Sequence, residues 1–172
     1  MARPEAAQSL GRPTFVARVR GSEAFCRSLD AVYAGLGGFL TIFVLAEMTT
    51  HLGKILLIAP FGASCVLVYA LPQSPLAQPR NVIGGHLVST CIGLVVAALL
   101  GTTPVAYGLG VGLAIAAMSL TRTLHPPAGA DPIVVIMTGA SWPFLFVPVL
   151  VGALVVVLMA AAFRRWATRK AA

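Results

Sequence analysis

The sequence predicts an all-α integral membrane protein: a compact bundle of four long and two short, interrupted helical segments. Composition, apolar stretches and the placement of basic residues lead to this fold class. The 172-residue chain is 58% hydrophobic and only 10% charged, whereas a soluble domain is about a quarter charged and under half apolar. Its mean hydropathy is +0.92. Because a globule of this length could not bury so much apolar surface, much of that surface must face lipid.

Four apolar stretches are long enough to cross a bilayer core, which requires about 20 helical residues. They are residues 31–50, 82–101, 105–121 and 145–163. Two further stretches, 55–71 and 125–139, are shorter and contain prolines. The first is broken at Pro60-Phe-Gly-Ala-Ser64, and the second opens with His125-Pro-Pro-Ala-Gly-Ala-Asp-Pro132. We expect these two stretches to form interrupted helices.

The basic residues predict how the chain crosses the membrane. Of the 12 Lys and Arg residues, five precede residue 31, four follow residue 163, and Lys54, Arg80 and Arg122 lie between apolar stretches. Lys and Arg near spans stay on the cytoplasmic side. Six crossings from a cytoplasmic N-terminus place every basic residue except Lys54 on that side. We therefore expect both termini in the cytoplasm, as in a bacterial inner-membrane protein. A nucleic-acid partner is not expected, because its basic residues would cluster on a soluble face.

The predicted domain organisation has three parts. Residues 1–30 form a basic cytoplasmic tail, 31–163 a transmembrane domain, and 164–172 a second basic cytoplasmic tail. The first tail lacks the apolar core of a signal peptide. Its residues 14–20 either rest on the membrane surface or belong to a disordered tail.

The two broken stretches share a pattern. Pro-x-Gly-Ala begins at Pro60 and again at Pro127. Biased composition alone produces scattered Val and Leu matches, but a shared pattern at both breaks favours a true repeat. Each half, about 31–101 and 104–163, would then contain a long, a broken and a long segment. An odd number of crossings inverts one half relative to the other.

Each break is predicted to start a short helix inside the membrane. Proline has no backbone donor, and Ser64 and Asp131 follow as candidate N-caps. The two helix N-termini would face each other near the midplane, where their unpaired N–H groups and partial positive charge form an anion site. The alternative is two kinked helices that only fill gaps in the bundle. The candidate substrate-binding residues are Pro60, Gly62, Ala63, Ser64, His125, Pro127, Gly129, Ala130 and Asp131.

Histidines and charged residues around the breaks have alternative roles. His125 would bind an anion when protonated or move a proton; alternatively it bonds a carbonyl that the prolines leave free. Asp131 would repel an anion unless it is protonated, paired with His125 or Arg122, or used as a cap. We expect His86 at the inner membrane interface. Candidate gating or mouth residues are Glu47, His51, Lys54 and Arg122, with a solvated loop and, for Arg122, an interfacial anchor as alternatives.

No catalytic or cofactor pattern is found. Cys26, Cys65 and Cys91 form no metal-binding spacing or disulfide framework. The sequence shows no Ser-His-Asp order, HExxH or Walker A, and Ser64 with His125 would be the weakest of nucleophile–base pairs. We expect neither an enzyme nor a bound cofactor or metal.

Three motifs resemble one known family. His125-Pro-Pro-Ala-Gly-Ala130 resembles the motif that names the HPP family of integral membrane proteins. Ala59-Pro-Phe-Gly-Ala-Ser64 and Pro79-Arg-Asn-Val-Ile-Gly-Gly-His86 are similar to its other characteristic stretches, so the resemblance covers about residues 31–163. It implies a compact helical membrane domain, usually described with four spans. Some plastid and cyanobacterial members are nitrite transporters, and others carry CBS domains.

These observations predict a secondary transporter or channel for a small inorganic anion, with nitrite as the best guess. The expected partners are the lipid bilayer, the anion and, for a chain this small, further copies of itself. Two alternatives remain open. One is a membrane scaffold or sensor subunit whose breaks are packed dry. The other is a proton or cation pathway through Glu47, His125 and Asp131.

Overall fold

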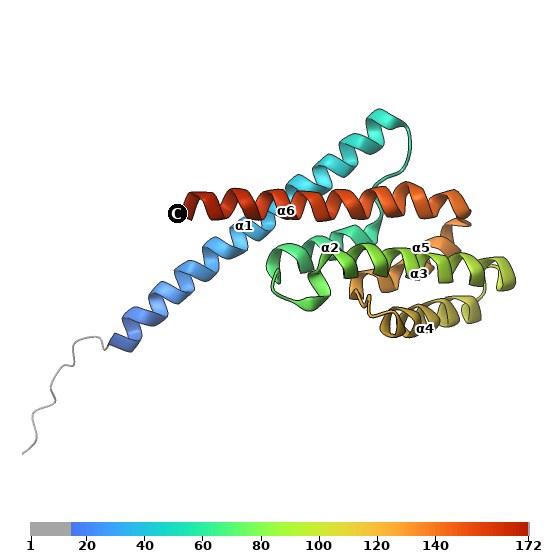
Figure 1. Ribbon diagram of the computed structural model, residues 1–172, viewed down its shortest axis with the longest axis horizontal. Helices are drawn as coiled ribbons and strands as arrows, with labels where there is room; N and C mark the ends of the chain where they lie inside the picture. Colours follow the sequence, from blue (N-terminus) through green and yellow to red (C-terminus); the bar gives the residue numbers. More distant parts are fainter. Residues whose placement is uncertain (1–14, 172) are drawn as a thin grey trace, which may run out of the picture.

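All regular secondary structure in the described part of the chain is helical. The computed structural model describes residues 15–171, and side chains from Asp30 to Trp166 (Figure 1). The α-helices are α1 (Phe15–Leu52), α2 (Ala59–Ala70), α3 (Pro79–Leu100), α4 (Pro104–Leu120), α5 (Asp131–Thr138) and α6 (Val151–Ala171). Shorter turns lie between them: η1 (Pro75–Ala77), η2 (Pro126–Ala130), η3 (Trp142–Leu145) and the π-turn η4 (Phe146–Leu150). This confirms the predicted all-α class.

Proline and glycine set most helix boundaries. Helices α2, α3, α4 and α5 each carry a proline in the first or second position, where its missing N–H is not needed. At the start of α4 the Thr103 hydroxyl also accepts a hydrogen bond from Ala106 N at 3.1 Å. Helix α5 ends at Gly139, whose φ of 61° and ψ of 34° are left-handed and favour glycine.

Within the residues that the structure describes, three segments are long and apolar enough to span a membrane: Asp30–Leu52, Pro79–Leu100 and Trp142–Trp166. Helix α4, with 17 residues, is intermediate between these spans and the short helices α2 and α5. The predicted span 145–163 becomes a regular α-helix only at Val151. Val147 is extended, with φ −132° and ψ 113°, because the following proline disfavours helical angles. At the other end, α1 includes residues 15–30 of the predicted tail.

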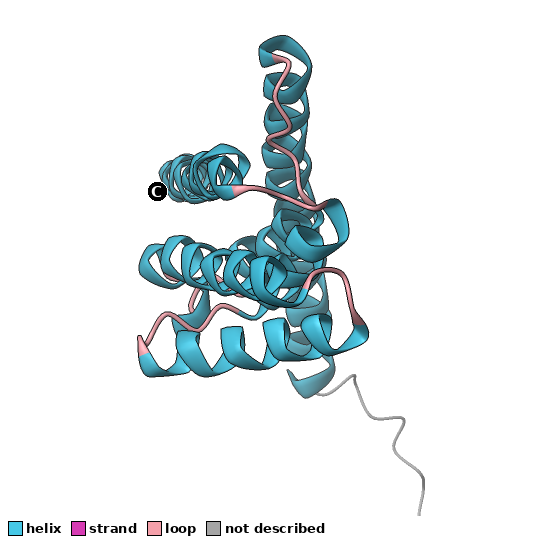
Figure 2. Ribbon diagram, turned by 90° about the vertical axis from the view of Figure 1, so that its right-hand side faces the viewer, coloured by secondary structure: helices cyan, strands magenta, loops and turns pink. Residues whose placement is uncertain are grey.

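The helices form one bundle in which α1 is oblique. Figure 1 shows α3 and α6 running in similar directions with α1 crossing them obliquely, and Figure 2 shows α4 lying lengthwise where α6 is seen almost end-on. Helix α3 packs on both α4 and α5, while α1 packs on α2 and α6. The start of α1 and the end of α6 lie at the same end of the bundle (Figure 1). Arg80, at the start of α3, donates from its guanidinium to Thr121 O at 3.2 Å. The inverted repeat and the cytoplasmic placement of this end stay predictions.

The two short helices start in the middle of the bundle and run in opposite directions (Figure 1). The apolar core fixes the first of them. Phe61, which is fully buried in α2, rests on Gly152 of α6, where any Cβ would overlap its ring. The same ring lies edge-on to the His86 ring, with centroids 5.1 Å apart. Packing of α2 on α6 therefore places the first break beside α3.

Candidate functional site

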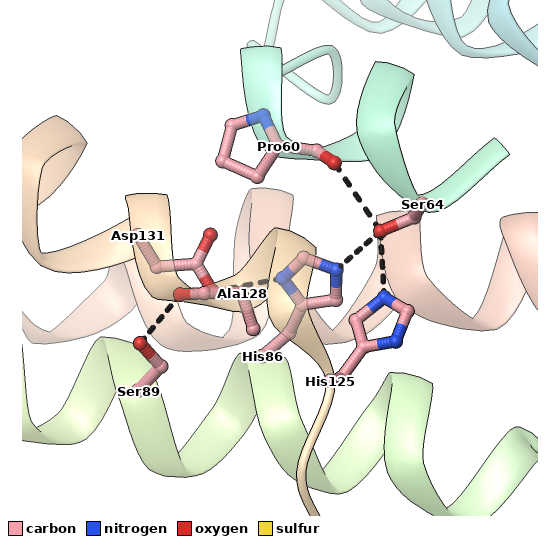
Figure 3. Close-up of polar contacts among 7 residues, drawn as sticks. All are labelled: Pro60, Ser64, His86, Ser89, His125, Ala128 and Asp131. Atoms are coloured by element: carbon pink, nitrogen blue, oxygen red, sulfur yellow. Dashed lines mark hydrogen bonds and ion pairs between the residues drawn. The ribbon is translucent and has the colours of Figure 1, made fainter. Parts of the chain in front are cut away.

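The two breaks meet at a hydrogen bond between Ser64 and His125. Ser64 Oγ lies 2.9 Å from His125 Nε2 (Figure 3). Ser64 lies one turn into α2, and His125 is the extended residue that precedes η2, with φ −137° and ψ 100°. Both side chains are fully buried. The structure thus brings together one candidate residue from each interrupted stretch.

His86 joins both breaks into one network. Its Nε2 lies 2.8 Å from Ser64 Oγ, and its Nδ1 lies 2.8 Å from Asp131 Oδ2 (Figure 3). The expectation that His86 is interfacial is wrong, since its exposed fraction is 0%. The physical reason is its depth: His86 lies about 10 Å along α3 from Pro79 at 1.5 Å per residue. We call Ser64, His86, His125 and Asp131 the polar quartet; all four have 0% exposure.

The neighbouring Gly85 gives the second break its position. A Cβ at Gly85 would lie 2.7 Å from His125 Cβ and 2.9 Å from Thr123 O. Only glycine therefore lets the extended chain before η2 approach α3 this closely. The Gly84-Gly85 pair just before His86 was the sequence signal that could have placed this histidine at a helix contact.

Further hydrogen bonds satisfy the irregular backbone of both breaks. Ser64 Oγ lies 3.2 Å from Pro60 O, and Ser89 Oγ donates to Ala128 O at 2.6 Å. His125 Nδ1 lies 2.9 Å from Leu76 O. Backbone carbonyls at membrane depth need such partners because lipid offers none. Leu76 belongs to η1, so a third segment supports the quartet.

Asp131 has a different partner and position from those considered in the sequence analysis. It bonds His86 instead of His125 or Arg122, and it is the first residue of α5, whose N-cap is Ala130. Arg122 is exposed in the turn after α4 and has a φ of 56°. Among the described side chains, two buried polar atoms have no hydrogen-bond partner: Asp131 Oδ1 and Thr90 Oγ1.

The structure hydrogen-bonds Ser64, His86 and Asp131 in that order, although no Ser-His-Asp pattern was recognised in the sequence. Their separation in sequence, and the placement of His86 at the interface, hid this relation. Ser64 is wholly buried in a helix, so the contact alone does not make it an accessible nucleophile.

The backbone N–H groups at the breaks are mostly used or missing. Pro126 and Pro127 have none, and Ala128 N already donates to His125 O at 3.0 Å. Phe61 N donates to Ile58 O at 3.1 Å. Donors at the junction of the breaks are therefore mainly side chains, whereas the sequence analysis assigned this role to backbone amides.

The small residues of the two Pro-x-Gly-Ala patterns lie around the quartet and make none of its hydrogen bonds. Gly62 and Ala63 are exposed on the opposite face of α2. Gly62 lines an apolar groove between α1 and α2. In η2, Pro127, Gly129 and Ala130 are half-buried.

The candidate mouth residues do not join the quartet. Glu47 and His51 pair with each other on the last turns of α1, 3.1 Å apart, with side chains 49% and 77% exposed. Lys54 is exposed in the turn that follows. No cluster of three or more His, Cys, Asp or Glu side chains suited to a metal ion is present within residues 30–166.

Comparison with known proteins identifies the family. The transmembrane region of the HPP family matches residues 24–172. The chain belongs to the HPP family. It is 37% identical over 150 residues to a transmembrane protein of Dictyostelium discoideum, which covers 80% of this chain and 48% of that protein. It is 41% identical over 122 residues to a second one, covering 66% of this chain and 43% of the relative. The chain thus spans about half the length of these relatives. No solved structure matches it.

In this HPP protein, the tripeptide that names the family has a definite structural role. His125 contributes its ring to the quartet, and Pro126 and Pro127 open η2. The prolines keep His125 extended, so that its side chain reaches Ser64 from outside any helix. The HPP motif is therefore part of the junction between the two interrupted helices of an integral membrane protein.

Proposed function

We propose that this HPP protein is a membrane transporter or channel for a small inorganic anion, and that nitrite is the first substrate to test. One observation carries the proposal. Two interrupted helices meet at hydrogen-bonded ionisable side chains that are wholly buried. A charged side chain in mid-membrane costs about 3 kcal/mol on insertion scales, and such residues usually line solute or proton paths.

The chemistry of the junction suits a small anion. Nitrite presents two acceptor oxygens, and the junction offers a serine hydroxyl between two imidazoles, 2.8 and 2.9 Å away. An anion that displaced the Ser64–His125 contact would find donors on both sides of it. The Asp131 carboxyl bonds His86 Nδ1, whereas Ser64 bonds Nε2 on the other side of the ring. The imidazole therefore separates the acidic group, which would repel an anion, from the Ser64–His125 contact.

The burial of the quartet also supports the alternative function, a membrane scaffold or sensor subunit that transports no solute. All four members of the quartet are sealed from solvent, so transport requires a path to open at the junction. A scaffold or sensor subunit would keep the quartet closed and bind no solute. The bacterial inner membrane, cytoplasmic termini and self-association remain parts of the proposal that need their own tests.

Flux measurements separate the two functions. Purified protein in proteoliposomes is offered nitrite, nitrate, chloride and sodium, each against protein-free liposomes. We expect nitrite uptake that His125→Ala lowers at least tenfold, because this variant removes one donor of the junction. The control is Met137→Ala, at a residue of α5 that is 66% exposed and should keep full flux. If no ion crosses with wild-type protein that is folded by size-exclusion chromatography, the transport proposal fails and the scaffold stands.

A further inference from the structure

The hydrogen atoms of the quartet can be counted. Ser64 has a single hydroxyl proton but three neighbours: Pro60 O, His86 Nε2 and His125 Nε2. His125 Nδ1 faces Leu76 O at 2.9 Å. Because a carbonyl only accepts, this nitrogen carries a proton in every state of the network. The remaining protons have three consistent placements. One pairs an Asp131 carboxylate with a His86 imidazolium; in the other two, either Asp131 or His125 holds the additional proton.

We propose that the quartet is a proton relay between Asp131 and His125, and that it couples anion movement to proton movement. This inference rests on the proposed transport function and specifies its coupling ion. The relay passes through Ser64, which belongs to the other interrupted helix. It does not involve Glu47, which the proton-pathway alternative in the sequence analysis had included.

In the placement with the additional proton on Asp131, the whole network is neutral. Protonated Asp131 donates to His86 Nδ1, His86 Nε2–H donates to Ser64 Oγ, and Ser64 O–H donates to His125 Nε2. In the placement with it on His125, His86 Nδ1–H donates to the Asp131 carboxylate, Ser64 O–H donates to His86 Nε2, and His125 Nε2–H donates to Ser64 Oγ. Both placements satisfy the same contacts of 2.8, 2.8 and 2.9 Å. Neither leaves a quartet nitrogen without a partner.

The conversion between the two placements transfers a net one proton from Asp131 to His125 and no electrons. The Asp131 proton passes to His86 Nδ1, the His86 Nε2 proton passes to Ser64 Oγ, and the Ser64 proton passes to His125 Nε2. Three N–H or O–H bonds break and three form. The net result is a carboxylate at Asp131 and an imidazolium at His125. The total charge of the quartet does not change, which matters where lipid cannot solvate an added charge.

Few other charges act on the quartet. His86 is the ionisable group that acts electrostatically on both His125 and Asp131. Helix α2 contributes Ser64 to this region, α3 contributes His86 and Thr90, and η2 with α5 contribute His125 and Asp131. Helix α4 has no acidic or basic residue, and α6 has none before Arg164. Proton position in the quartet is therefore set mainly by its own members and by any charge that enters the junction.

An entering anion would drive the relay. A negative charge beside Ser64 and His125 favours the imidazolium form of His125, since opposite charges stabilise each other. The proton would leave Asp131 as the anion binds. Asp131 can then be reprotonated through Oδ1, the oxygen that has no hydrogen-bond partner. Each anion would thereby move with one proton.

Two measurements test the relay independently. The first uses proteoliposomes loaded with a pH-sensitive dye and given a nitrite gradient, while internal nitrite is assayed chemically and leakage through protein-free liposomes is subtracted. We expect about one proton to enter with each nitrite, and Asp131→Asn to lower this ratio at least tenfold. Nitrite entry without protons in the wild type overturns the relay but leaves transport intact. Absence of nitrite entry overturns the proposed function instead.

The second measurement does not require transport. Nitrogen-15 NMR of protein in lipid nanodiscs reports which nitrogen of each buried histidine carries hydrogen. An asparagine at position 131 can donate to His86 Nδ1 but cannot release a proton to it. We expect Asp131→Asn to hold His86 in the Nε2–H form and His125 neutral, while the wild type populates both placements. Identical histidine spectra in the two proteins would refute the relay even if they carry nitrite equally well.

Discussion

The two interrupted stretches share a sequence pattern but differ in structure and chemistry. In the first, the chain is extended up to Ile58 and then continues directly as α2, which has 12 residues. In the second, His125 is followed by the five-residue turn η2 before the eight-residue α5 begins. The first break supplies only the neutral Ser64 to the quartet, whereas the second supplies both ionisable ends. A shared backbone pattern therefore does not imply a shared role.

The difference between the two interrupted stretches shows that the functional residues must be sought where the stretches meet. Neither break makes a complete site, and the histidine that joins them belongs to the uninterrupted helix α3. Variants at corresponding places in the two breaks should therefore differ in effect. The following predictions start with the largest expected effect.

Replacing Asp131, the acidic member of the quartet, by alanine should reduce the stability of the protein most. Asp131→Ala leaves the buried His86 Nδ1 without its partner at 2.8 Å, and breaking a buried pair costs about 3–5 kcal/mol. We expect a large drop in the thermal unfolding temperature in detergent. Asp131→Asn is the matched variant, because it keeps a hydrogen bond to His86. Equal stability of the two variants would show that the contact with His86 does not support the fold.

Adding a methyl group at Gly85, where α3 contacts the second break, should have the next largest effect on stability. In Gly85→Ala the new Cβ would meet His125 Cβ at 2.7 Å and Thr123 O at 2.9 Å. Overpacking of this kind costs about 1–3 kcal/mol. The control is Gly108→Ala in α4, where nothing lies within 4 Å, and the helix should gain up to about 1 kcal/mol. The measurement is the thermal unfolding temperature of both variants. An unchanged unfolding temperature for Gly85→Ala would argue against close packing at this position.

Removing the Ser64 hydroxyl, which the first break contributes to the quartet, should reduce stability less. Ser64→Ala leaves two imidazole nitrogens without their hydroxyl partner, for a loss of about 1–3 kcal/mol. The serine contributes no charge, so the loss should stay below that of Asp131→Ala. Ala63→Ser, at the exposed neighbour on the same helix, should leave the unfolding temperature unchanged. A larger loss for Ser64→Ala than for Asp131→Ala would reverse the comparison drawn above.

The smallest effects should occur at the shared glycines. A Cβ would meet nothing within 4 Å at either Gly62 or Gly129. Gly62→Ala, in a regular helix, should stabilise the protein by up to about 1 kcal/mol, and Gly129→Ala should change little. Clear destabilisation of either variant in the lipid bilayer, but not in detergent, would indicate that another molecule packs against that break.

Sequence patterns predicted the helical class and both breaks because apolar length and proline act locally. Ser64, His125 and Asp131 were candidates for the same reason, since they lie next to those breaks. His86 was assigned to the wrong environment, because its burial depends on how α3 packs against residues of α2, η2 and α5 that are distant in sequence. The Asp131–His86 pair likewise joins residues 45 positions apart and has no local signature. The kink at Val147 was missed within a stretch whose composition is uniformly apolar.

The close contact between the Phe61 ring and Gly152 limits which helices of the bundle can move separately. Because the ring is wedged into the backbone of α6 and borders His86, α2 cannot tilt about its start without lifting off the last helix. We therefore expect the first interrupted stretch and α6 to move together. A gate at the junction would then form at η2, which an extended segment joins to the turn after α4.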